Sequence, residues 1–373
     1  MMYQGTNIDG PSLAPEQLNI RGKNLTSLIQ ESSYLEVVHH IITGAFPSEK
    51  ELKEIHHFCN QSLHSILNNT EAIALIKQQA FQSKDITKTI IQGLLLGFQE
   101  EFNIVLSSQE ITYDKDTAYG LFLISTIPLF VGIAIQEIEK ENIGSLSSIH
   151  LEQSYTENVF QLFFGRTNTI KEELILFESL LIAWHAGFGH LTPSVMGPRV
   201  AAGTYSSMEM ILITGFTCSG PFHIGASQFA FSFLENYKND TLENTLEAIK
   251  SKLASNEKIP GFGHPLFKKD PRNNTLQEIW SKCISDKRHI KKYNAICSLL
   301  EEIKGLQPNI DFITAGILCE FSATQATLAP SIALFSRASA ILAHAKEKKQ
   351  KPPFGSKSKD ARKHLDQLSM GWI

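Results

Sequence analysis

Residues 259–272 read Ile-Pro-Gly-Phe-Gly-His-Pro-Leu-Phe-Lys-Lys-Asp-Pro-Arg, and this stretch decides both the fold and the function that the sequence predicts. Pro260 and Pro265 fix the backbone dihedral φ on either side of the segment that ends in His264. The two glycines in that segment permit positive φ and a close approach of a ligand. An imidazole presented on such a turn can donate a hydrogen bond to a substrate oxygen. We therefore expect an active-site loop here.

Positive charge follows the histidine directly. Lys268, Lys269 and Arg272 lie within eight residues of His264. The planar guanidinium of Arg272 offers a bidentate fork that suits a carboxylate. The loop therefore predicts a site for an anionic acid whose carbonyl group is polarised by His264.

Two further positions carry candidate chemistry. His223 lies on a Gly- and Pro-containing turn between two apolar stretches, and Asp311 opens the apolar run 312–318. A carboxylate at the start of a helix is usually a cap or a partner of the helix dipole. Among apolar neighbours it can instead be a desolvated general base. Two histidines and one carboxylate suit enolisation next to a carbonyl group.

Composition limits the class of protein. The chain has 373 residues, of which 42% are hydrophobic and 19% charged, with a net charge of −4. This length favours two unequal domains, and the charge argues against a nucleic-acid partner. The five cysteines stand singly, which argues against a disulfide framework or a cysteine metal site and suits a cytoplasmic location. No metal site or cofactor is predicted.

Helical periodicity dominates the rest of the chain. Residues 242–253 and 293–303 each carry an apolar stripe at helical spacing, and Ser48 with Glu51 forms a capping-box start. Residues 117–136 carry no charge, but glycines and Pro128 interrupt them, so a buried core helix bent at Pro128 is favoured over a membrane span. The predicted fold class is mainly α.

Three motifs resemble the citrate synthase family, which includes 2-methylcitrate synthases and citryl-CoA lyase-like members. Residues 260–272 are similar to the family signature, with one residue fewer between the histidine and Asp-Pro-Arg. Residues 220–226 resemble the turn Gly-Pro-Leu-His-Gly-Gly-Ala, and residues 308–312 resemble Pro-Asn-Val-Asp-Phe. Three flanking blocks agree in order, namely residues 21–47, 154–165 and 336–344.

The resemblance implies a role for each matching residue. Asp311 would remove a proton from the acyl-CoA thioester, and His223 would hydrogen-bond the thioester oxygen. His264 would polarise the carbonyl of a 2-oxo acid, whose carboxylates Arg272 and Arg337 would bind. Lys268 and Lys269 are either contacts to the CoA phosphates or a solvated pair.

The resemblance also implies an architecture and an activity. A large helical domain would comprise residues 1–223 and 334–373, and a smaller mobile helical domain residues 224–333, in a homodimer. The expected enzyme is an acyltransferase that condenses acetyl-CoA or another acyl-CoA with oxaloacetate. The thioester is itself a substrate, so no cofactor is needed.

The chain departs from the family pattern in two places. The usual His-Ala-Asp-His-Glu is replaced by residues 185–190, His-Ala-Gly-Phe-Gly-His, so His190 is the nearest substitute for the oxo-acid-binding histidine and His185 is expected in the core. The usual C-terminal Arg-Pro-Arg is replaced by residues 350–354, Gln-Lys-Pro-Pro-Phe, which leaves Lys351 or Arg362 as stand-ins. These departures keep two alternatives open: a citryl-CoA lyase-like enzyme, and a non-catalytic binding or assembly subunit.

Overall fold

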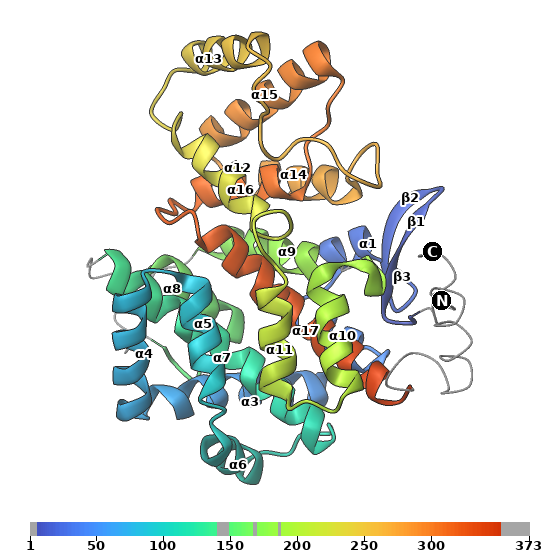
Figure 1. Cartoon of the computed structure of the whole chain (residues 1–373), viewed down its shortest axis with the longest axis vertical. Helices are drawn as coiled ribbons and strands as arrows, with labels where there is room; N and C mark the ends of the chain where they lie inside the picture. Colours follow the sequence, from blue (N-terminus) through green and yellow to red (C-terminus); the bar gives the residue numbers. More distant parts are fainter. Residues whose placement is uncertain (1–5, 140–148, 167–169, 186–187, 352–373) are drawn as a thin grey trace, which may run out of the picture.

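The computed structural model describes residues 6–139, 149–166, 170–185 and 188–351. Within these ranges the chain forms seventeen α-helices, a short 3₁₀ helix and one small sheet (Figure 1). The predicted mainly α fold is therefore confirmed.

One group of helices forms the larger body of the molecule, drawn in the lower part of Figure 1. Its members are α1 (Leu25–Glu31), α2 (Tyr34–Thr43), α3 (Glu49–Leu67), α4 (Thr70–Ser83), α5 (Ile86–Leu95), α6 (Gln99–Ser108), α7 (Lys115–Glu139), α8 (Tyr155–Phe164), α9 (Lys171–His185), η2 (Gly189–Leu191), α10 (Pro193–Gly203), α11 (Met208–Thr217) and α17 (Leu328–Lys349). The predicted capping box of Ser48 and Glu51 starts α3.

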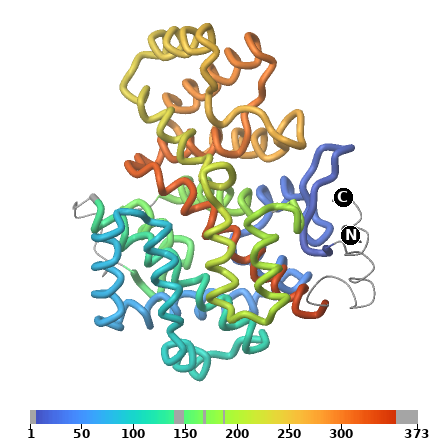
Figure 2. The backbone as a smooth tube through the Cα atoms, viewed as in Figure 1, coloured from blue at the N-terminus to red at the C-terminus, as the bar shows by residue number. Residues whose placement is uncertain are grey.

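A second group lies above the first, and the tube in Figure 2 shows the few connections between the two. It comprises α12 (Ala226–Glu235), α13 (Leu242–Ala254), α14 (Pro271–Cys283), α15 (Arg288–Lys304) and α16 (Ile310–Glu320). These helices lie within residues 224–333, the range predicted for a small domain. The predicted boundary after residue 333 falls inside α17, which is one continuous helix from Leu328.

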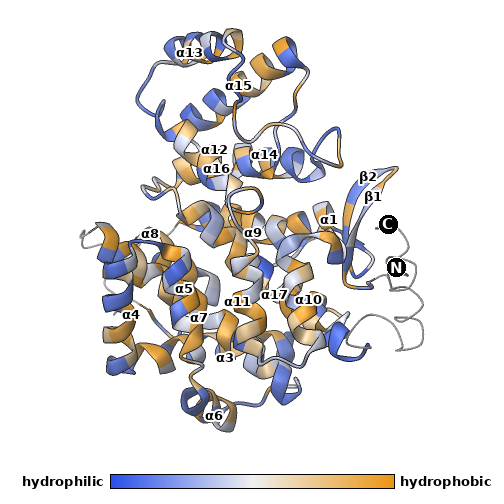
Figure 3. Cartoon of the chain, in the orientation of Figure 1, coloured by the Kyte–Doolittle hydropathy of each residue, from blue (hydrophilic) through white to orange (hydrophobic). Residues whose placement is uncertain are grey.

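Two long helices form the centre of the large group. α17 is buried from Leu328 to Ala345, and α7 contains Pro128 and is buried along nearly all of its apolar length. Both are long and apolar enough to span a membrane by length and composition, but 94% of the most apolar stretch of α7 and 100% of that of α17 lie buried inside the molecule. Figure 3 shows them as apolar helices surrounded by others. The prediction of a buried helix over residues 117–136 is confirmed.

The small sheet was not predicted. β1 (Asp9–Leu13), β2 (Glu16–Ile20) and β3 (Lys23–Asn24) form an antiparallel meander in which Gly10 is opposite Asn19. The segment contains Gly and Pro and lacks a regular alternation of β-branched residues, so no strand signal stands out. β2 contacts α1 and α14, which brings the sheet against both helix groups.

Candidate active site

The loop that carries His264 is hydrogen-bonded to the start of the helix that carries Asp311. The Gly263 N–H donates to the carbonyl of Gln307 at 2.8 Å, and the Asn309 N–H donates to the carbonyl of Gly261 at 2.9 Å. The Asn309 side-chain amide donates to the Gly263 carbonyl at 3.0 Å. Two segments far apart in sequence are thus held as one short ladder.

Gly261 makes this close approach possible. Its φ is +83°, and a Cβ atom there would lie 2.7 Å from Phe312 Cβ and 3.0 Å from the Phe312 backbone nitrogen. Any larger residue would push the loop away from α16. The sequence argument expected a close approach of a ligand, and the close partner that the structure shows is Phe312 of α16.

Asp311 lies in the first turn of α16, and its backbone N–H donates to the Asn309 side chain at 3.0 Å. Burial raises the pKa of its carboxyl group to about 7, while the positive charge of Arg272 opposes this rise. No hydrogen bond to its carboxylate oxygens is found among the described residues. Asp311 therefore has the properties of a general base rather than of a cap, since Asn309 is the cap.

Asp270 connects Arg272 to the same helix. The carboxylate of Asp270 accepts hydrogen bonds from Arg272 Nε at 2.8 Å and Nη2 at 2.6 Å, and also from the backbone N–H of Ile310 at 3.1 Å. Both side chains of this ion pair are buried. Burial alone would raise the pKa of Asp270, but the Arg272 charge and these hydrogen bonds lower it. Arg272 is therefore oriented by Asp270 beside the N-terminus of α16.

His264 has a defined tautomer. Its Nδ1 accepts hydrogen bonds from the backbone N–H groups of Leu266 and Phe267, both at 3.1 Å. Burial lowers the pKa of His264, so the ring is neutral at pH 7. With Nδ1 unprotonated, the proton lies on Nε2, which is then a donor for a substrate oxygen.

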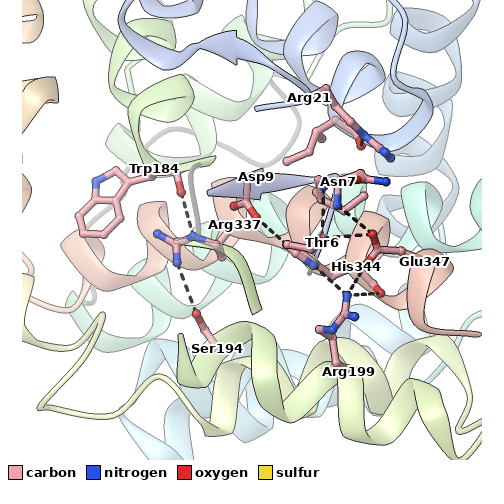
Figure 4. Close-up of polar contacts among 12 residues, drawn as sticks. Thr6, Asn7, Asp9, Arg21, Trp184, Ser194, Arg199, Arg337, His344 and Glu347 are labelled. Atoms are coloured by element: carbon pink, nitrogen blue, oxygen red, sulfur yellow. Dashed lines mark hydrogen bonds and ion pairs between the residues drawn. The ribbon is translucent and has the colours of Figure 1, made fainter. Parts of the chain in front are cut away.

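His223 is hydrogen-bonded to a serine hydroxyl. Its Nε2 lies 2.9 Å from Ser194 Oγ. Ser194 Oγ also accepts a hydrogen bond from Arg337 Nη1 at 3.4 Å (Figure 4). When the Ser194 hydroxyl donates to Nε2, the ring proton of His223 lies on Nδ1 and is available to a substrate oxygen. Burial, together with the charge of Arg337, lowers the pKa of His223 to about 4, so the ring is neutral at pH 7.

Arg337 is a buried cation from the middle of α17. Its Nε donates to the Trp184 carbonyl at 3.0 Å, and its side chain forms no ion pair with a carboxylate among the described residues. Burial and the positive charge of Arg272 lower its pKa to about 10, and the negative charge of Asp9 opposes this fall. Such a cation favours an anionic ligand.

The charges of Arg272 and Arg337 change the pKa values of the other candidate groups, which shows that these groups lie near one another. The charge of Arg272 acts on Asp311, His264 and Arg337, and the charge of Arg337 acts on His223. The five groups come from the loop 259–264, the turn 219–225 and helices α14, α16 and α17. The arrangement provides a base, two neutral N–H donors and two guanidinium groups, which can stabilise an enolate and bind a carboxylate.

His190 belongs to a different cluster. Burial lowers its pKa, and the nearby charges that act on it include those of Arg199, Glu347 and Lys351. Figure 4 shows this neighbourhood, where Arg199 pairs with Glu347 at 2.6 Å beside His344. His344 in turn bonds Asp9 at 2.7 Å.

Phe188 occupies the place beside His264 that the sequence pattern predicts for His190. The ring of Phe188 lies 5.3 Å from that of His264, and the guanidinium carbon of Arg272 lies 5.7 Å from its centre. His185 is fully buried and bonds Ser339 at 2.7 Å, as expected of a core histidine.

Lys268 and Lys269, the predicted CoA contacts, lie on the surface, unlike the more buried groups described above. The Lys268 and Lys269 side chains are exposed, and their backbone N–H groups donate to the Glu16 carboxylate at 2.9 and 3.3 Å. Of the two proposed stand-ins for the C-terminal arginine, Lys351 lies 3.4 Å from Glu347, and Arg362 lies outside the described residues.

Four residues of the site were not found from the sequence: Trp184, Phe188, Ser194 and Asp270. Asp270 precedes Pro271 at a helix start, which is a recognisable N-cap signal, and it does cap α14. The other three have no local signal, because their contacts come from distant segments. Among the described residues, no group of three or more His, Cys, Asp or Glu side chains could hold a metal ion.

Known proteins share this arrangement of helices. The citrate synthase of Thermotoga maritima aligns with a TM-score of 0.73 at 19% identity, covering 93% of this chain and 89% of that one. The citrate synthase of Thermoplasma acidophilum, solved in a ternary complex with carboxymethyl coenzyme A and oxaloacetate, aligns with a TM-score of 0.72 at 20% identity, covering 92% and 89%.

Sequence comparison gives the family. The citrate/2-methylcitrate synthase of Bacillus subtilis strain 168 is 27% identical over 322 residues, which cover 84% of this chain and 81% of the relative. The citrate synthase of Heyndrickxia coagulans is 26% identical over 309 residues, covering 81% and 78%. The family described as "Citrate synthase, C-terminal domain" matches residues 1–354. This chain therefore belongs to the citrate synthase family.

Proposed function

We propose that this enzyme condenses an acyl-CoA thioester with a 2-oxo acid, with acetyl-CoA and oxaloacetate as the reference pair. The observation that carries the proposal is Asp311, a desolvated carboxyl group hydrogen-bonded through its neighbours to the loop of His264. A weak base placed in this way suits the removal of a proton from carbon next to a thioester.

The reaction needs a donor for each developing oxyanion. As Asp311 takes the proton, the thioester oxygen becomes an enolate oxygen, to which His223 Nδ1–H donates. The enolate carbon then attacks the 2-oxo carbon, and His264 Nε2–H donates to the oxygen that becomes the hydroxyl group. Both rings are neutral at pH 7 and held by fixed partners, so neither has to reorient during the reaction. Water then hydrolyses the thioester and releases CoA.

The anionic substrate would be bound by the guanidinium groups. Arg337 supplies a buried positive charge without a carboxylate partner among the described residues, and Arg272 supplies its remaining N–H donors. Exclusion of water strengthens both interactions.

The CoA part of the substrate has two candidate contacts. The predicted pair Lys268 and Lys269 is exposed and can meet phosphates. A pocket of about 390 Å³ adjoins the catalytic loop at Ile259 and Phe262, with Lys258 and Lys304 in its lining. We propose that the thioester arm passes along this loop, where either lysine pair can contact the phosphates. No further cofactor is required.

Release of the CoA thiol tests the proposal directly. Purified protein is mixed with acetyl-CoA or longer acyl-CoAs and a panel of 2-oxo acids, and thiol formation is followed with a chromogenic disulfide. Asp311→Ala should lower kcat by at least about 1,000-fold while the Kd for the 2-oxo acid stays within a few-fold. Asp286→Ala, which removes an exposed carboxylate from the small domain, serves as the control.

Two results would contradict the assignment. Turnover that survives in Asp311→Ala would show that another group is the base, and absence of thiol release with every pair would exclude a condensing enzyme. In the wild type, kcat/KM should fall as the pH drops below about 7, because protonated Asp311 cannot accept a proton.

A citryl-CoA lyase-like activity is the second candidate. The same base and donors serve the reverse cleavage of a citryl thioester, and the run His-Leu-Thr-Pro at residues 190–193 and the missing C-terminal arginine favour this alternative. Formation of acetyl-CoA from citryl-CoA without net hydrolysis to citrate would identify it. Dominant hydrolysis would exclude it.

A further inference from the structure

Aromatic rings form one wall of the candidate site. Phe267 stacks on His264 with 5.1 Å between the ring centres, and Phe188 lies 5.3 Å from His264 and 5.8 Å from Phe267. Arg272 also contacts aromatic rings: its guanidinium carbon is 5.7 Å from the ring centre of Phe188 and 5.9 Å from that of Trp184. The surroundings of His264 and Arg272 are therefore mainly apolar.

Phe188 is held in this position by its backbone. Its φ is +51°, and Gly189 follows with a φ of +69°. A Cβ atom on Gly189 would lie 3.4 Å from the carbonyl oxygen of Asp9, so the turn is packed against β1. The Phe188 side chain remains partly exposed, whereas Phe267 is buried. Phe188 thus presents an apolar face to the space beside His264.

The charges of the site favour a single carboxylate. Arg272 is neutralised by its two hydrogen bonds to Asp270, whereas Arg337 has no carboxylate partner among the described residues. In the described part of the chain, these two arginines are the cations that act on Asp311, His264 and His223. Arg337 is therefore the guanidinium of the two that forms no ion pair in the described part of the chain, although the charge of Asp9 acts on it, and it is the one that remains for a substrate carboxylate.

We propose that the second substrate is a 2-oxo acid with one carboxylate and an apolar substituent, rather than a dicarboxylate such as oxaloacetate. This inference rests on the proposed condensing function. The carboxylate pairs with Arg337, the 2-oxo oxygen accepts from His264 Nε2–H, and the substituent lies against Phe188. Bond formation at the 2-oxo carbon then gives a 2-hydroxy acid that carries the apolar group.

The physical reason is desolvation. A second carboxylate in this position would lose its water against a phenyl ring that offers no hydrogen-bond donor, and such a loss is unfavourable. An alkyl group gains by leaving water at the same place. Pockets discriminate strongly when a polar substrate group would be left without a partner.

The experiment compares kcat/KM for oxaloacetate with that for pyruvate, 2-oxobutanoate and 4-methyl-2-oxopentanoate, with acetyl-CoA in the thiol-release assay. We expect the best apolar 2-oxo acid to exceed oxaloacetate at least about tenfold. A preference for oxaloacetate would overturn this inference but leave the condensing function intact. Thiol release with none of the four would instead count against the condensing function itself.

Two variants test the residue. Phe188→His supplies a donor at the apolar wall and should shift the preference toward oxaloacetate at least about tenfold. Histidine tolerates positive φ better than phenylalanine, so the backbone is compatible with this change. Phe188→Leu keeps the wall apolar and should retain the preference for the apolar acid. An unchanged preference in Phe188→His would show that Phe188 does not contact the substituent.

Discussion

Two aspartates at the starts of neighbouring helices have opposite properties. Asp270 accepts hydrogen bonds from the side chain and backbone of Arg272 and from the Ile310 N–H, which lower its pKa. Asp311 is buried, none of the described residues donates a hydrogen bond to its carboxylate, and burial raises its pKa to about 7. The difference between the two carboxylates is hydrogen bonding to the charged form. Asp270 has such bonds and is structural, whereas Asp311, on the neighbouring helix, has the raised pKa of a reactive group.

Burial of the charged Asp311 carboxylate costs folding free energy, so replacement of Asp311 by a neutral residue should stabilise the protein at high pH. Its folded-state pKa is raised above the unfolded value, so the wild type loses stability as the pH rises from about 4 to about 7. Asp311→Asn does not titrate, so its stability relative to the wild type should rise by about 3 kcal/mol between pH 4.5 and pH 8. Urea unfolding at both pH values measures this.

Asp286→Asn is the matched control for that measurement. Asp286 is exposed, and hydrogen bonds from Arg288 lower its pKa, so removal of its charge should bring no gain at high pH. Equal behaviour of the two variants would contradict a desolvated Asp311.

The chemistry of single residues was largely predictable from the sequence, but their neighbours were not. His264, His223, Asp311, Arg272 and Arg337 are recognisable from motifs, and the structure brings them together. His190 was preferred for its residue type although it is two residues out of register with the family pattern, and Phe188, which stands at the matching position, is the side chain that lies beside His264. Ser194 could not be assigned to the site from local sequence, because its partner His223 is 29 residues away in the chain.

At the scale of elements, the hydrogen bonds between the loop 261–263 and residues 307–309 hold His264 in place relative to Asp311. Gly261→Ala should therefore damage both stability and catalysis. The new Cβ would clash with Phe312 and must also adopt positive φ, which together should cost about 2–4 kcal/mol and lower kcat. Urea unfolding midpoints and thiol-release rates measure the two effects.

The variant Gly263→Ala measures the cost of positive φ without the clash with Phe312 that is expected in Gly261→Ala. Gly263 has nearly the same φ, +82°, but a Cβ atom added there would meet only Leu306 Cδ2, at 4.0 Å. It should therefore lose about 1 kcal/mol from backbone strain alone. If both variants lose equal stability and activity, close packing of Gly261 on α16 is not what positions the loop.

Helices were predicted better than the sheet. The capping box at Ser48 and the apolar stripes of α13 and α15 carry local signals, and these helices form where expected. The strands β1–β3 depend on contacts with α1 and α14, so their stability comes from tertiary packing, which local patterns do not reveal.

At the scale of the whole molecule, the two helix groups share the site. His264, Arg272 and Asp311 come from the small group, whereas Arg337, Ser194 and Phe188 come from the large one. Glu16 on the sheet also reaches the small group, because its carboxylate accepts the backbone N–H groups of Lys268 and Lys269. The resemblance implied two domains with a boundary after residue 333, and this position falls inside α17, which is continuous from Leu328 to Lys349.

An apolar face on the large group supports the predicted homodimer. α10 and α11 pack side by side (Figure 1), and four large apolar side chains on these helices and on the turn between them are exposed. These are Met196, Val200, Tyr205 and Met210, which are 45–68% exposed. Exposed apolar side chains that gather on neighbouring helices are typical of a protein–protein interface. We therefore predict that the protein sediments with twice the mass of the chain.

A single charge on this face should separate the subunits. In Val200→Glu, each copy would bring a carboxylate into the contact between two identical faces, where it would be desolvated and lie near its equivalent, so the dimer should weaken at least about tenfold. Phe81→Glu makes the same change at an exposed apolar residue of α4, which lies on the other side of the large group from α10 (Figure 1), and should leave the mass unchanged. Sedimentation equilibrium distinguishes the two. A dimer that persists in Val200→Glu, or a wild-type monomer, would place the interface elsewhere or remove it.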